Sequence, residues 1–513
     1  MLIFETVLGL LLAATALSTI AKRAGIPYPT ILALGGALAA FVPGAPRLDL
    51  PPDLILALFV APVLMDAAYD TSLRDLRANW RPVLWLILVA VGLTTITVAF
   101  TARQLLPDLP WAAAIALGAL LAPPDAVAAL AVLRQVNPPH RIRQVLEGES
   151  LLNDASALLL YKLAVGAVAA GAFSLSEALP TFAAVVLGSV VAGWLLAWLP
   201  TYLLHPIEDA PTSVIFQFVM TFCVWLLAER LGLSGVVTIV VFGLTTARRT
   251  SRPMSARLRV ASFAIWESVT VVLNILAFTL IGLQLRPIVD ALDSGQRLQA
   301  FGAALAILFV VIAVRFIWVM MYGTLAQWKN AVFGFGASTS PPTTKGALLI
   351  AWSGMRGIVT LAAALALPAD FPHRDFILLT AFVVVFGTLV IQGLTLRPLL
   401  LLLRLPRDRT VETELSLARE AALKAAITEL ESDDTPAARR LTLEYTQALD
   451  QARRGGDPHD TPDNALKRQM LGKSRRAIHD LRRTGVIGDE AYRRVEEELD
   501  WLELSARPTP TPD

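Results

Sequence analysis

The sequence predicts an all-α integral membrane protein with a soluble helical C-terminal tail. Of the 513 residues, 55% are hydrophobic and only 17% are charged, whereas a soluble domain usually carries about a quarter charged residues. Long apolar runs dominate residues 1–405, and residues 406–513 are dense in Arg, Glu and Asp. We therefore expect a transmembrane domain over 1–405 and a helical tail over 406–513.

Thirteen apolar stretches are candidates for membrane-spanning helices, since a span needs about 20 mainly apolar residues. The second and ninth are short, so twelve or fourteen spans also fit the pattern. The candidates are 2–20, 28–43, 52–70, 82–106, 111–134, 146–172, 178–204, 212–231, 234–248, 261–285, 298–325, 345–367 and 375–403.

Basic residues indicate how these spans are oriented, because cytoplasmic loops carry an excess of Lys and Arg. With the N-terminus outside, the inner loops hold 15 basic residues and the outer loops hold six. Glu5 precedes the first apolar run, and Lys22 and Arg23 follow it, which favours a retained span over a cleaved signal peptide. The pattern predicts a multi-pass protein of the bacterial cytoplasmic (inner) membrane, with its tail in the cytoplasm.

The tail is expected to be helical. Four stretches rich in Ala, Leu, Arg and Glu are separated by turn residues, and the last residues, 508–513, are expected to be disordered. The helical stretches are 412–430, 436–454, 465–483 and 489–504.

Composition argues against several classes of protein. The net charge of +2 and the lack of a long basic stripe argue against nucleic-acid binding. Cys223 is the single cysteine and the five His residues are scattered, so no zinc site is indicated. The sequence has no complete Gly-rich phosphate loop. We expect no cofactor and no resident metal ion.

The segment Glu147-Gly-Glu-Ser-Leu-Leu-Asn-Asp154, which enters the sixth span, carries the strongest functional signal. On a helix, Glu149, Ser150, Asn153 and Asp154 share one face, opposite a face of leucines. The alternative is a polar contact between helices, but two acids within one and a half turns are costly in a membrane. The polar face therefore predicts a functional site.

Two spans contain predicted helix breaks. Two prolines precede Asp125 in Leu121-Ala-Pro-Pro-Asp-Ala126, and two glycines bracket Arg356 in Trp352-Ser-Gly-Met-Arg-Gly-Ile358. Interrupted helices in corresponding places of two halves indicate a transporter's binding site. The alternatives are a simple proline kink at Asp125 and, for Arg356, a position near the inner membrane edge.

Three further ionisable residues lie within predicted spans. Arg315 keeps its charge and needs an acid, for which Glu149 is preferred, although snorkelling to an interface is the alternative. Asp66 lies near the inner end of its span, where it would either line an inner funnel or cap a helix. Lys162 has no assigned role, and an outer aqueous funnel is one environment that would suit it.

These motifs resemble those of the cation:proton antiporter superfamily, in its electroneutral branch of bacterial sodium/proton antiporters and relatives of animal sodium/hydrogen exchangers. The resemblance rests on Gly148-Glu-Ser-Leu-Leu-Asn-Asp154, Pro124-Asp125 and Gly354-Met-Arg-Gly357, and covers about residues 1–405. It implies an inverted-repeat fold with a mobile core domain and a dimerisation domain, two broken helices that cross in the core, and a homodimer.

The resemblance also implies roles for the polar residues. Asp154 would be the essential carboxylate for the cation and the proton, and Asn153 would mark the electroneutral branch. Ser150 and Asp125 would add cation ligands. Asp66 falls where relatives often have Glu and is grouped with the cation-binding residues.

Arg356 would compensate the helix ends at the crossing, and Glu149 would form a structural ion pair with Arg315. One departure matters: many relatives have Thr-Asp-Pro where this chain has Pro124-Asp125-Ala126. The lost hydroxyl leaves open the choice between sodium and potassium.

The function predicted is electroneutral exchange of sodium for protons across the bilayer, by alternating access, with both ions competing for Asp154. The alternative is a potassium/proton antiporter on the same scaffold. An intramembrane enzyme would need a nucleophile with a base or a His-Glu metal motif, and the His residues lie in loops or in the tail. A passive channel is disfavoured by the buried charges and the two broken helices.

Overall fold

The computed structural model describes residues 2–42, 51–78, 84, 89–133, 138–170, 175–200, 209–249, 255–292, 295, 297–333, 343–406, 408 and 410–507. All regular secondary structure within these residues is helical, which confirms the predicted fold class. The chain divides into two compact units, Met1–Leu405 and Pro406–Asp513, at the position where the composition changes.

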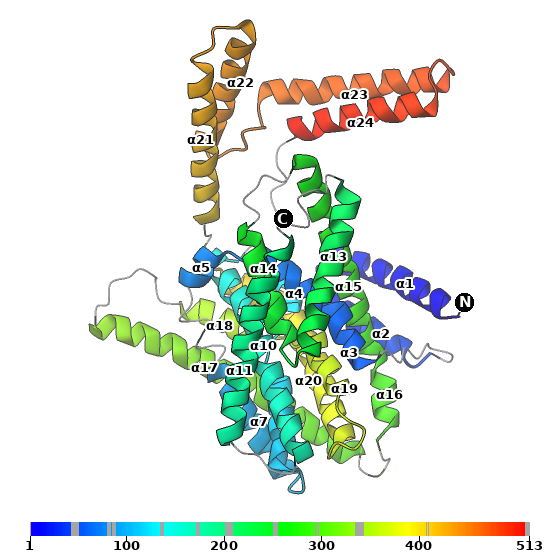
Figure 1. Ribbon diagram of the computed structural model, residues 1–513, viewed down its shortest axis with the longest axis vertical. Coiled ribbons are helices and arrows are strands. Elements are labelled where there is room, and N and C mark those ends of the chain that lie inside the picture. The colour runs from blue at the N-terminus through cyan, green and yellow to red at the C-terminus, as the bar shows by residue number, and fades with distance from the viewer. Residues whose placement is uncertain are drawn as a thin grey trace. The chain divides into compact units, whose positions relative to one another are not determined.

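The first unit consists of long helices, short helices and one π-helical turn, η1 (Figure 1). In chain order these are α1 (Leu2–Ala24), α2 (Tyr28–Ala39), α3 (Pro52–Ile55), η1 (Leu56–Val60), α4 (Ala61–Asp70), α5 (Leu73–Ala78), α7 (Val91–Leu105), α8 (Trp111–Leu121), α9 (Ala126–Leu133), α10 (His140–Ala170), α11 (Leu175–Leu196), α13 (Ala210–Arg230), α14 (Gly235–Arg249), α15 (Ala256–Leu283), α16 (Leu285–Asp290), α17 (Arg297–Phe333), α18 (Thr344–Trp352), α19 (Ile358–Leu365) and α20 (Arg374–Leu403).

Each predicted apolar stretch overlaps one of these helices or a consecutive group of them, although most of 82–90 and all of 508–513 lie outside the described residues. By length and composition, five helical segments of the described chain could cross a membrane, and several shorter helices are also apolar. The five segments are 140–169, 210–230, 258–290, 297–325 and 374–403.

The start of α10 differs from the prediction, because the helix begins at His140 rather than at residue 146. The added turns are polar and contain an ion pair between Arg143 and Glu147, 2.8 Å apart and four residues apart on one helix face. Such pairs stabilise a helix in water. The apolar pattern marks only the part of a helix that is buried in lipid or protein, so it misses this extension.

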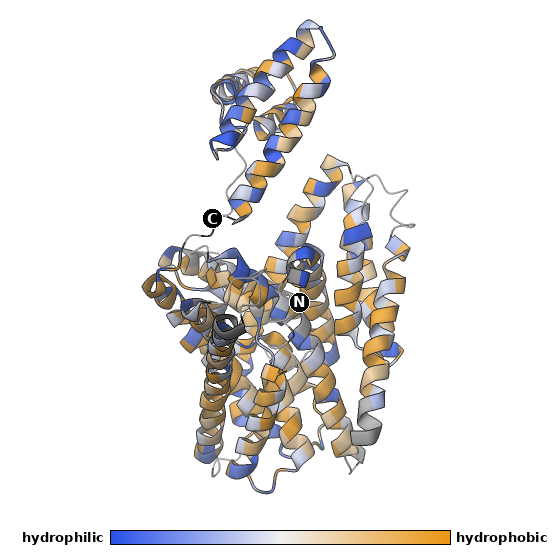
Figure 2. Cartoon of the chain, turned by 90° about the vertical axis from the view of Figure 1, so that its left-hand side faces the viewer, coloured by the Kyte–Doolittle hydropathy of each residue, from blue (hydrophilic) through white to orange (hydrophobic). Residues whose placement is uncertain are grey.

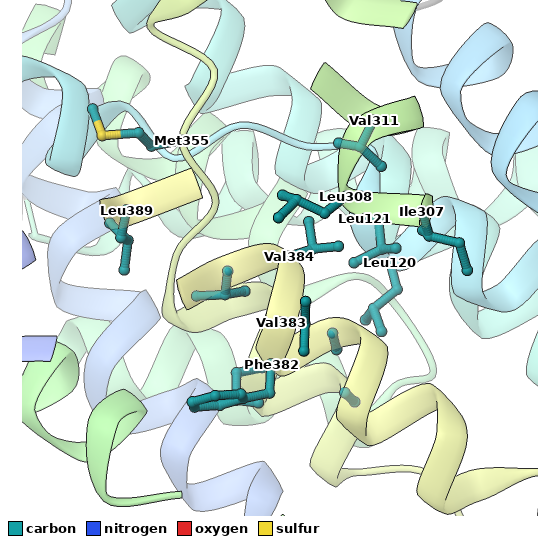
Figure 3. Close-up of a cluster of buried hydrophobic side chains, with 14 of the residues drawn as sticks. Leu120, Leu121, Ile307, Leu308, Val311, Met355, Phe382, Val383, Val384 and Leu389 are labelled. Carbon is teal, nitrogen blue, oxygen red and sulfur yellow. The ribbon is translucent and has the colours of Figure 1, made fainter. Parts of the chain in front are cut away.

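Buried side chains form two main clusters in the first unit. The larger cluster joins α7–α10 with α17–α20 and also includes residues of α1, α2, α15 and α16. We call α7–α10 and α17–α20 the core group. Figure 3 shows part of it, where Leu120 and Leu121 of α8 lie beside Leu308 and Val311 of α17 and Val384 of α20. The second cluster joins α4, α13 and α14, which we call the scaffold group; α11 packs against α14.

Many large apolar side chains of the first unit are exposed, among them Leu187 and Val191 on α11 and Phe309 and Ile317 on α17. Hydrophobic colouring predominates over these helices in Figure 2, whereas the tail helices carry many hydrophilic residues. Apolar faces of this extent are typical of a surface that meets lipid or another chain. The first unit is therefore built as a multi-span membrane domain.

The second unit is a set of two helical hairpins, each made of two helices that pack side by side (Figure 1). Threonine hydroxyls cap the N-termini of two helices, as Thr435 accepts from Ala438 N–H and Thr461 from Asn464 N–H. Salt bridges such as Lys467–Glu444, at 2.6 Å, link the helices. The helices are α21 (Thr410–Leu430), α22 (Pro436–Arg453), α23 (Pro462–Arg483) and α24 (Asp489–Ala506).

Candidate functional site

The two predicted helix breaks are present, and they meet. Residues 122–125 separate α8 from α9, and residues 353–357 separate α18 from α19. The backbone N–H of Asp125 in the first break donates to the carbonyl of Met355 in the second, at 2.6 Å. Prolines 123 and 124 explain the first break, because they lack the N–H groups that an α-helix needs. A backbone donor of the first break is thus paired with a backbone acceptor of the second.

Arg356 is buried and holds the crossing together. Its Nε donates to the carbonyl of Leu121, at the C-terminus of α8, at 3.1 Å, and Nη1 donates to the carbonyl of Gly354. Its backbone N–H donates to the hydroxyl of Thr388 on α20, at 3.1 Å. A helix C-terminus has unpaired carbonyls and a partial negative charge, both of which a guanidinium compensates. Arg356 is 1% exposed and so does not lie at an open membrane edge.

Arg356 lies at a helix C-terminus, whereas the carboxylate of Asp125 lies at helix N-termini. Its Oδ1 accepts the N–H of Val127, in the first turn of α9, at 2.8 Å. A Cβ placed on Gly357, the residue before α19, would overlap the same carboxylate. Asp125 therefore lies against the positive N-terminal ends of both α9 and α19, which favour an anion. Only glycine at position 357 allows this approach.

Glu149 and Arg315 form a bidentate ion pair inside the core group. Nη1 and Nη2 of Arg315 lie 2.6 and 2.9 Å from Oε1 and Oε2 of Glu149. The two side chains are 0% and 3% exposed, so Arg315 does not snorkel to an interface. Nη2 of Arg315 also donates to the carbonyl of Ile350, in the last turn of α18, at 3.2 Å. Each half-helix that ends at the crossing thus has an arginine at its C-terminus.

Asn153 and Asp154 follow on the next turn of α10. The amide nitrogen of Asn153 donates to Oε1 of Glu149 at 3.3 Å, while its Oδ1 is buried and has no partner among the described residues. Asp154 is 7% exposed, and no described group donates a hydrogen bond to its carboxylate. It is close enough to Asp125 for the two carboxylates to interact electrostatically. Asp154 is thus an acid without a fixed cationic partner in the described chain.

Ser150 and Asp66 lie farther out. Ser150 is half-buried on α10, one turn before Asp154. Asp66 is half-buried on α4, a helix that packs against α14 and α10. Both side chains have polar interactions of their own.

The sequence pattern did not identify three contributors. Thr388 lies in an apolar stretch and was not distinguishable from a lipid-facing threonine. Tyr161, whose hydroxyl donates to the carbonyl of Ala363 at 2.7 Å, fixes α10 to α19. Glu229 forms an ion pair with Lys162 at 2.7 Å, which gives that lysine a partner. An acid close to the end of a span was the available signal for Glu229, but nothing in the sequence linked it to Lys162.

The charged residues around the crossing differ in whether a described group pairs with them. Glu149 is engaged by Arg315, Asp125 by two helix N-termini, and Arg356 by two carbonyls. Asp154 differs from them, because no cationic side chain of the described residues pairs with it. Sequence comparison bears on what such a cluster does. Residues 8–402 match the family described as "Sodium/hydrogen exchanger, transmembrane".

The chain belongs to this family. The prediction from the motifs around Asp125, Asp154 and Arg356 is therefore confirmed at the level of the family. A family of transmembrane exchangers also excludes the intramembrane enzyme considered as an alternative. The matched residues fall within the first unit, Met1–Leu405.

Two relatives carry the name "Sodium, potassium, lithium and rubidium/H(+) antiporter". The one from Bacillus pumilus (strain SAFR-032) is 32% identical over 447 residues, and the one from Bacillus subtilis (strain 168) is 33% identical over 412 residues. The matches cover 83% and 77% of this chain, but 65% and 61% of the relatives. The chain thus spans less than two thirds of the length of these relatives.

A solved structure is similar in fold. It is that of the sodium proton antiporter MjNhaP1 from Methanocaldococcus jannaschii, with a TM-score of 0.60 at 18% sequence identity. The match covers 79% of the present chain and 100% of the solved one. The all-helical arrangement is thus similar in fold to that antiporter.

Proposed function

We propose that the protein is a secondary antiporter that exchanges sodium ions for protons across the cytoplasmic membrane. Asp154 binds either a proton or the cation, but not both, and the loaded core group then presents the site to the other side of the membrane. Asn153 assists Asp154. Its side-chain nitrogen donates to Oε1 of Glu149, and its Oδ1 remains available as a cation ligand. The cycle needs no cofactor and no resident metal ion.

The observation that supports this proposal most strongly is the contrast between Asp154 and its charged neighbours. A buried carboxylate is costly in an apolar environment unless it is protonated or meets a cation. The other charged residues near it have partners in the structure, since Glu149 pairs with Arg315 and Arg356 donates to the carbonyl of Leu121. Competition between a proton and a metal ion then takes place at one carboxylate.

The ligands proposed for the cation are oxygen atoms. Asp154 supplies a carboxylate, Ser150 a hydroxyl, Asn153 an amide oxygen, and the breaks at 122–125 and 353–357 backbone carbonyls. Hard oxygen ligands suit small hard cations. Asp125 would act as a nearby negative charge or as a further ligand, and Asp66 as an acid on the route from the inner side.

The setting of the exchanger in the membrane is also part of the proposal. The distribution of basic residues supports an outside N-terminus and a cytoplasmic tail in a bacterial cytoplasmic (inner) membrane. The exposed apolar faces of the first unit support contact with lipid and with a second copy of the chain. A homodimer is therefore proposed, with monovalent cations and protons as the transported partners.

The experiment is proton release from everted membrane vesicles on addition of sodium, potassium or lithium salts. The wild-type protein should release protons on sodium addition, and Asp154→Asn should not, because an amide cannot cycle a proton. Asp290→Asn, which changes an exposed acid outside the site, is the matched control and should exchange normally. Sodium-driven release by Asp154→Asn at the wild-type rate would contradict the proposal.

The same assay decides between sodium and the alternative cation, potassium. The names of the Bacillus relatives include both ions. Many relatives have a threonine hydroxyl in the first break where this chain has Pro124, and its absence leaves the choice between sodium and potassium open. Proton release with potassium but not with sodium would replace the sodium/proton assignment by a potassium/proton antiporter.

A further inference from the structure

Lys162 and Glu229 form an ion pair that the exchange site does not use. The ammonium of Lys162 lies 2.7 and 3.1 Å from the two carboxylate oxygens of Glu229. The side chains are 51% and 37% exposed. Lys162 is eight residues beyond Asp154 on α10, which corresponds to about 12 Å along the helix axis. The pair thus lies between Asp154 and the Ala170 end of α10.

On one side, the pair is attached to the core group. Tyr161, the residue next to Lys162, donates its hydroxyl to the carbonyl of Ala363 on α19 at 2.7 Å. Tyr161 and Ala164 belong to the buried cluster of the core group. This part of α10 is therefore fixed to α19 and moves with it.

On the other side, the pair is attached to the scaffold group. Glu229 lies in the last turn of α13, and its Oε1 also accepts the N–H of Gly235, the first residue of α14, at 3.1 Å. The loop between the two helices is in turn held by α11, as Ser189 accepts the N–H of Ser234 at 2.9 Å. The carboxylate of Glu229 is thus part of a fixed hairpin.

Apolar side chains of α10 also contact the scaffold group. Leu158, one turn before Lys162, packs against both clusters, and Leu151, farther from Lys162 along the helix, belongs to the cluster of the scaffold group. Apolar surfaces can slide past each other without loss of specific partners. An ion pair with an N···O distance of 2.7 Å, by contrast, is broken by a displacement of several ångströms. Alternating access requires one bundle to move against the other.

We propose that Lys162 and Glu229 form a latch that closes in one access state and must open before the helix that carries Asp154 can move. This inference rests on the exchange proposed above. The pair is part-exposed, at 51% and 37%, so opening it leaves neither charge fully enclosed. The buried Glu149–Arg315 pair, by contrast, joins α10 to α17 within the core group, where separating the two charges would be costly.

Neutral variants give the first test. Lys162→Gln and Glu229→Gln remove the charges, and Gln at 229 keeps an oxygen for the N–H of Gly235. Each should change the apparent sodium affinity about two- to fivefold, as expected for an exposed pair that biases a two-state equilibrium. The double variant should match the single variants, because one latch can be lost only once. Multiplying effects would contradict the latch.

Cross-linking gives the decisive test. Lys162→Cys and Glu229→Cys are combined with Cys223→Ser, which removes the free exposed cysteine, and are joined by a reducible bifunctional thiol reagent in proteoliposomes. Sodium/proton exchange should fall at least tenfold and return on reduction. Arg143→Cys with Glu147→Cys, a pair within α10, is the control and should exchange equally with and without the cross-link.

Measurements on the reduced and on the cross-linked protein test the exchange function and the latch independently. Exchange by the reduced protein tests the proposed function, and its loss on cross-linking tests the latch. Unchanged exchange by the cross-linked Lys162→Cys/Glu229→Cys protein would overturn the latch, because it would show that the two bodies need not separate there.

Discussion

The two interrupted helices cross at their breaks, but they are built from different residues. The break between α8 and α9 is made by prolines and carries an acid, Asp125, which caps the start of α9. The break between α18 and α19 is made by glycines and carries a base, Arg356, which caps the end of α8. Because of this difference, neither break has all its helix ends and backbone groups paired by its own residues. Each supplies a group that the other one needs.

This complementarity explains why the crossing can exist in a membrane. Backbone groups at membrane depth must be paired within the protein, because lipid offers no partners. The Asp125 N–H bond to the carbonyl of Met355 and the bond from Arg356 to Leu121 cross between the breaks. The acidic Asp125 and the basic Arg356 are also of opposite formal charge. The crossing is therefore held by bonds that do not involve Asp154.

The largest effect is expected at the ion pair that supports the second break. Arg315 holds the last turn of α18, so Glu149→Ala or Arg315→Ala should each destabilise the protein by about 3–5 kcal/mol, the cost of an uncompensated buried charge. The double variant should lose less than the sum of the two. Thermal unfolding of the purified protein in detergent measures these losses. Additive losses would show that the pair does not act as a unit.

A smaller effect is expected where the two breaks touch. A methyl group at residue 357 would overlap the carboxylate of Asp125, so Gly357→Ala should cost about 1–3 kcal/mol, the range for overpacking a core. Gly302→Ala is the matched control, because a Cβ there meets nothing within 4 Å. The same unfolding measurement applies. Equal stability of the two variants would argue against close contact between the breaks.

The smallest effect on stability is expected at Asp125 itself. Asn is as good a helix N-cap as Asp, so Asp125→Asn should change the unfolding free energy by less than about 0.5 kcal/mol, while Asp125→Ala should cost about 0.5–2 kcal/mol. Vesicle exchange assays on both variants then separate the cap from the charge. If Asp125→Asn exchanges like the wild type, the negative charge of Asp125 is not needed at the site.

Much of this arrangement could be predicted from the sequence because its signals are local. Prolines before Asp125 and glycines around Arg356 mark the breaks directly, and the polar face of α10 follows from helical spacing. For Arg315, charge alone narrowed the partners to a few acids, with Glu149 preferred and snorkelling as the alternative. The structure brings Arg315 and Glu149 into contact.

The rest depends on packing between segments that are distant in the chain. The bond from Arg356 to Thr388 and the pair of Lys162 with Glu229 join residues 32 and 67 positions apart. No spacing rule links such residues, and a threonine or a lysine in an apolar stretch has many suitable environments. The start of α10 was also missed, because its first turns are polar and lie beyond the apolar pattern.

Transport stoichiometry shows whether Asp154 alone exchanges its proton for a cation. The sodium/proton reversal point should be measured in proteoliposomes with and without a membrane potential set by potassium and valinomycin. One carboxylate exchanges one proton for one sodium ion, so the reversal point should not depend on voltage. A clear voltage dependence would contradict exchange at Asp154 alone and would show that a second acid, Asp125 being the nearest candidate, titrates with Asp154 as a coupled pair.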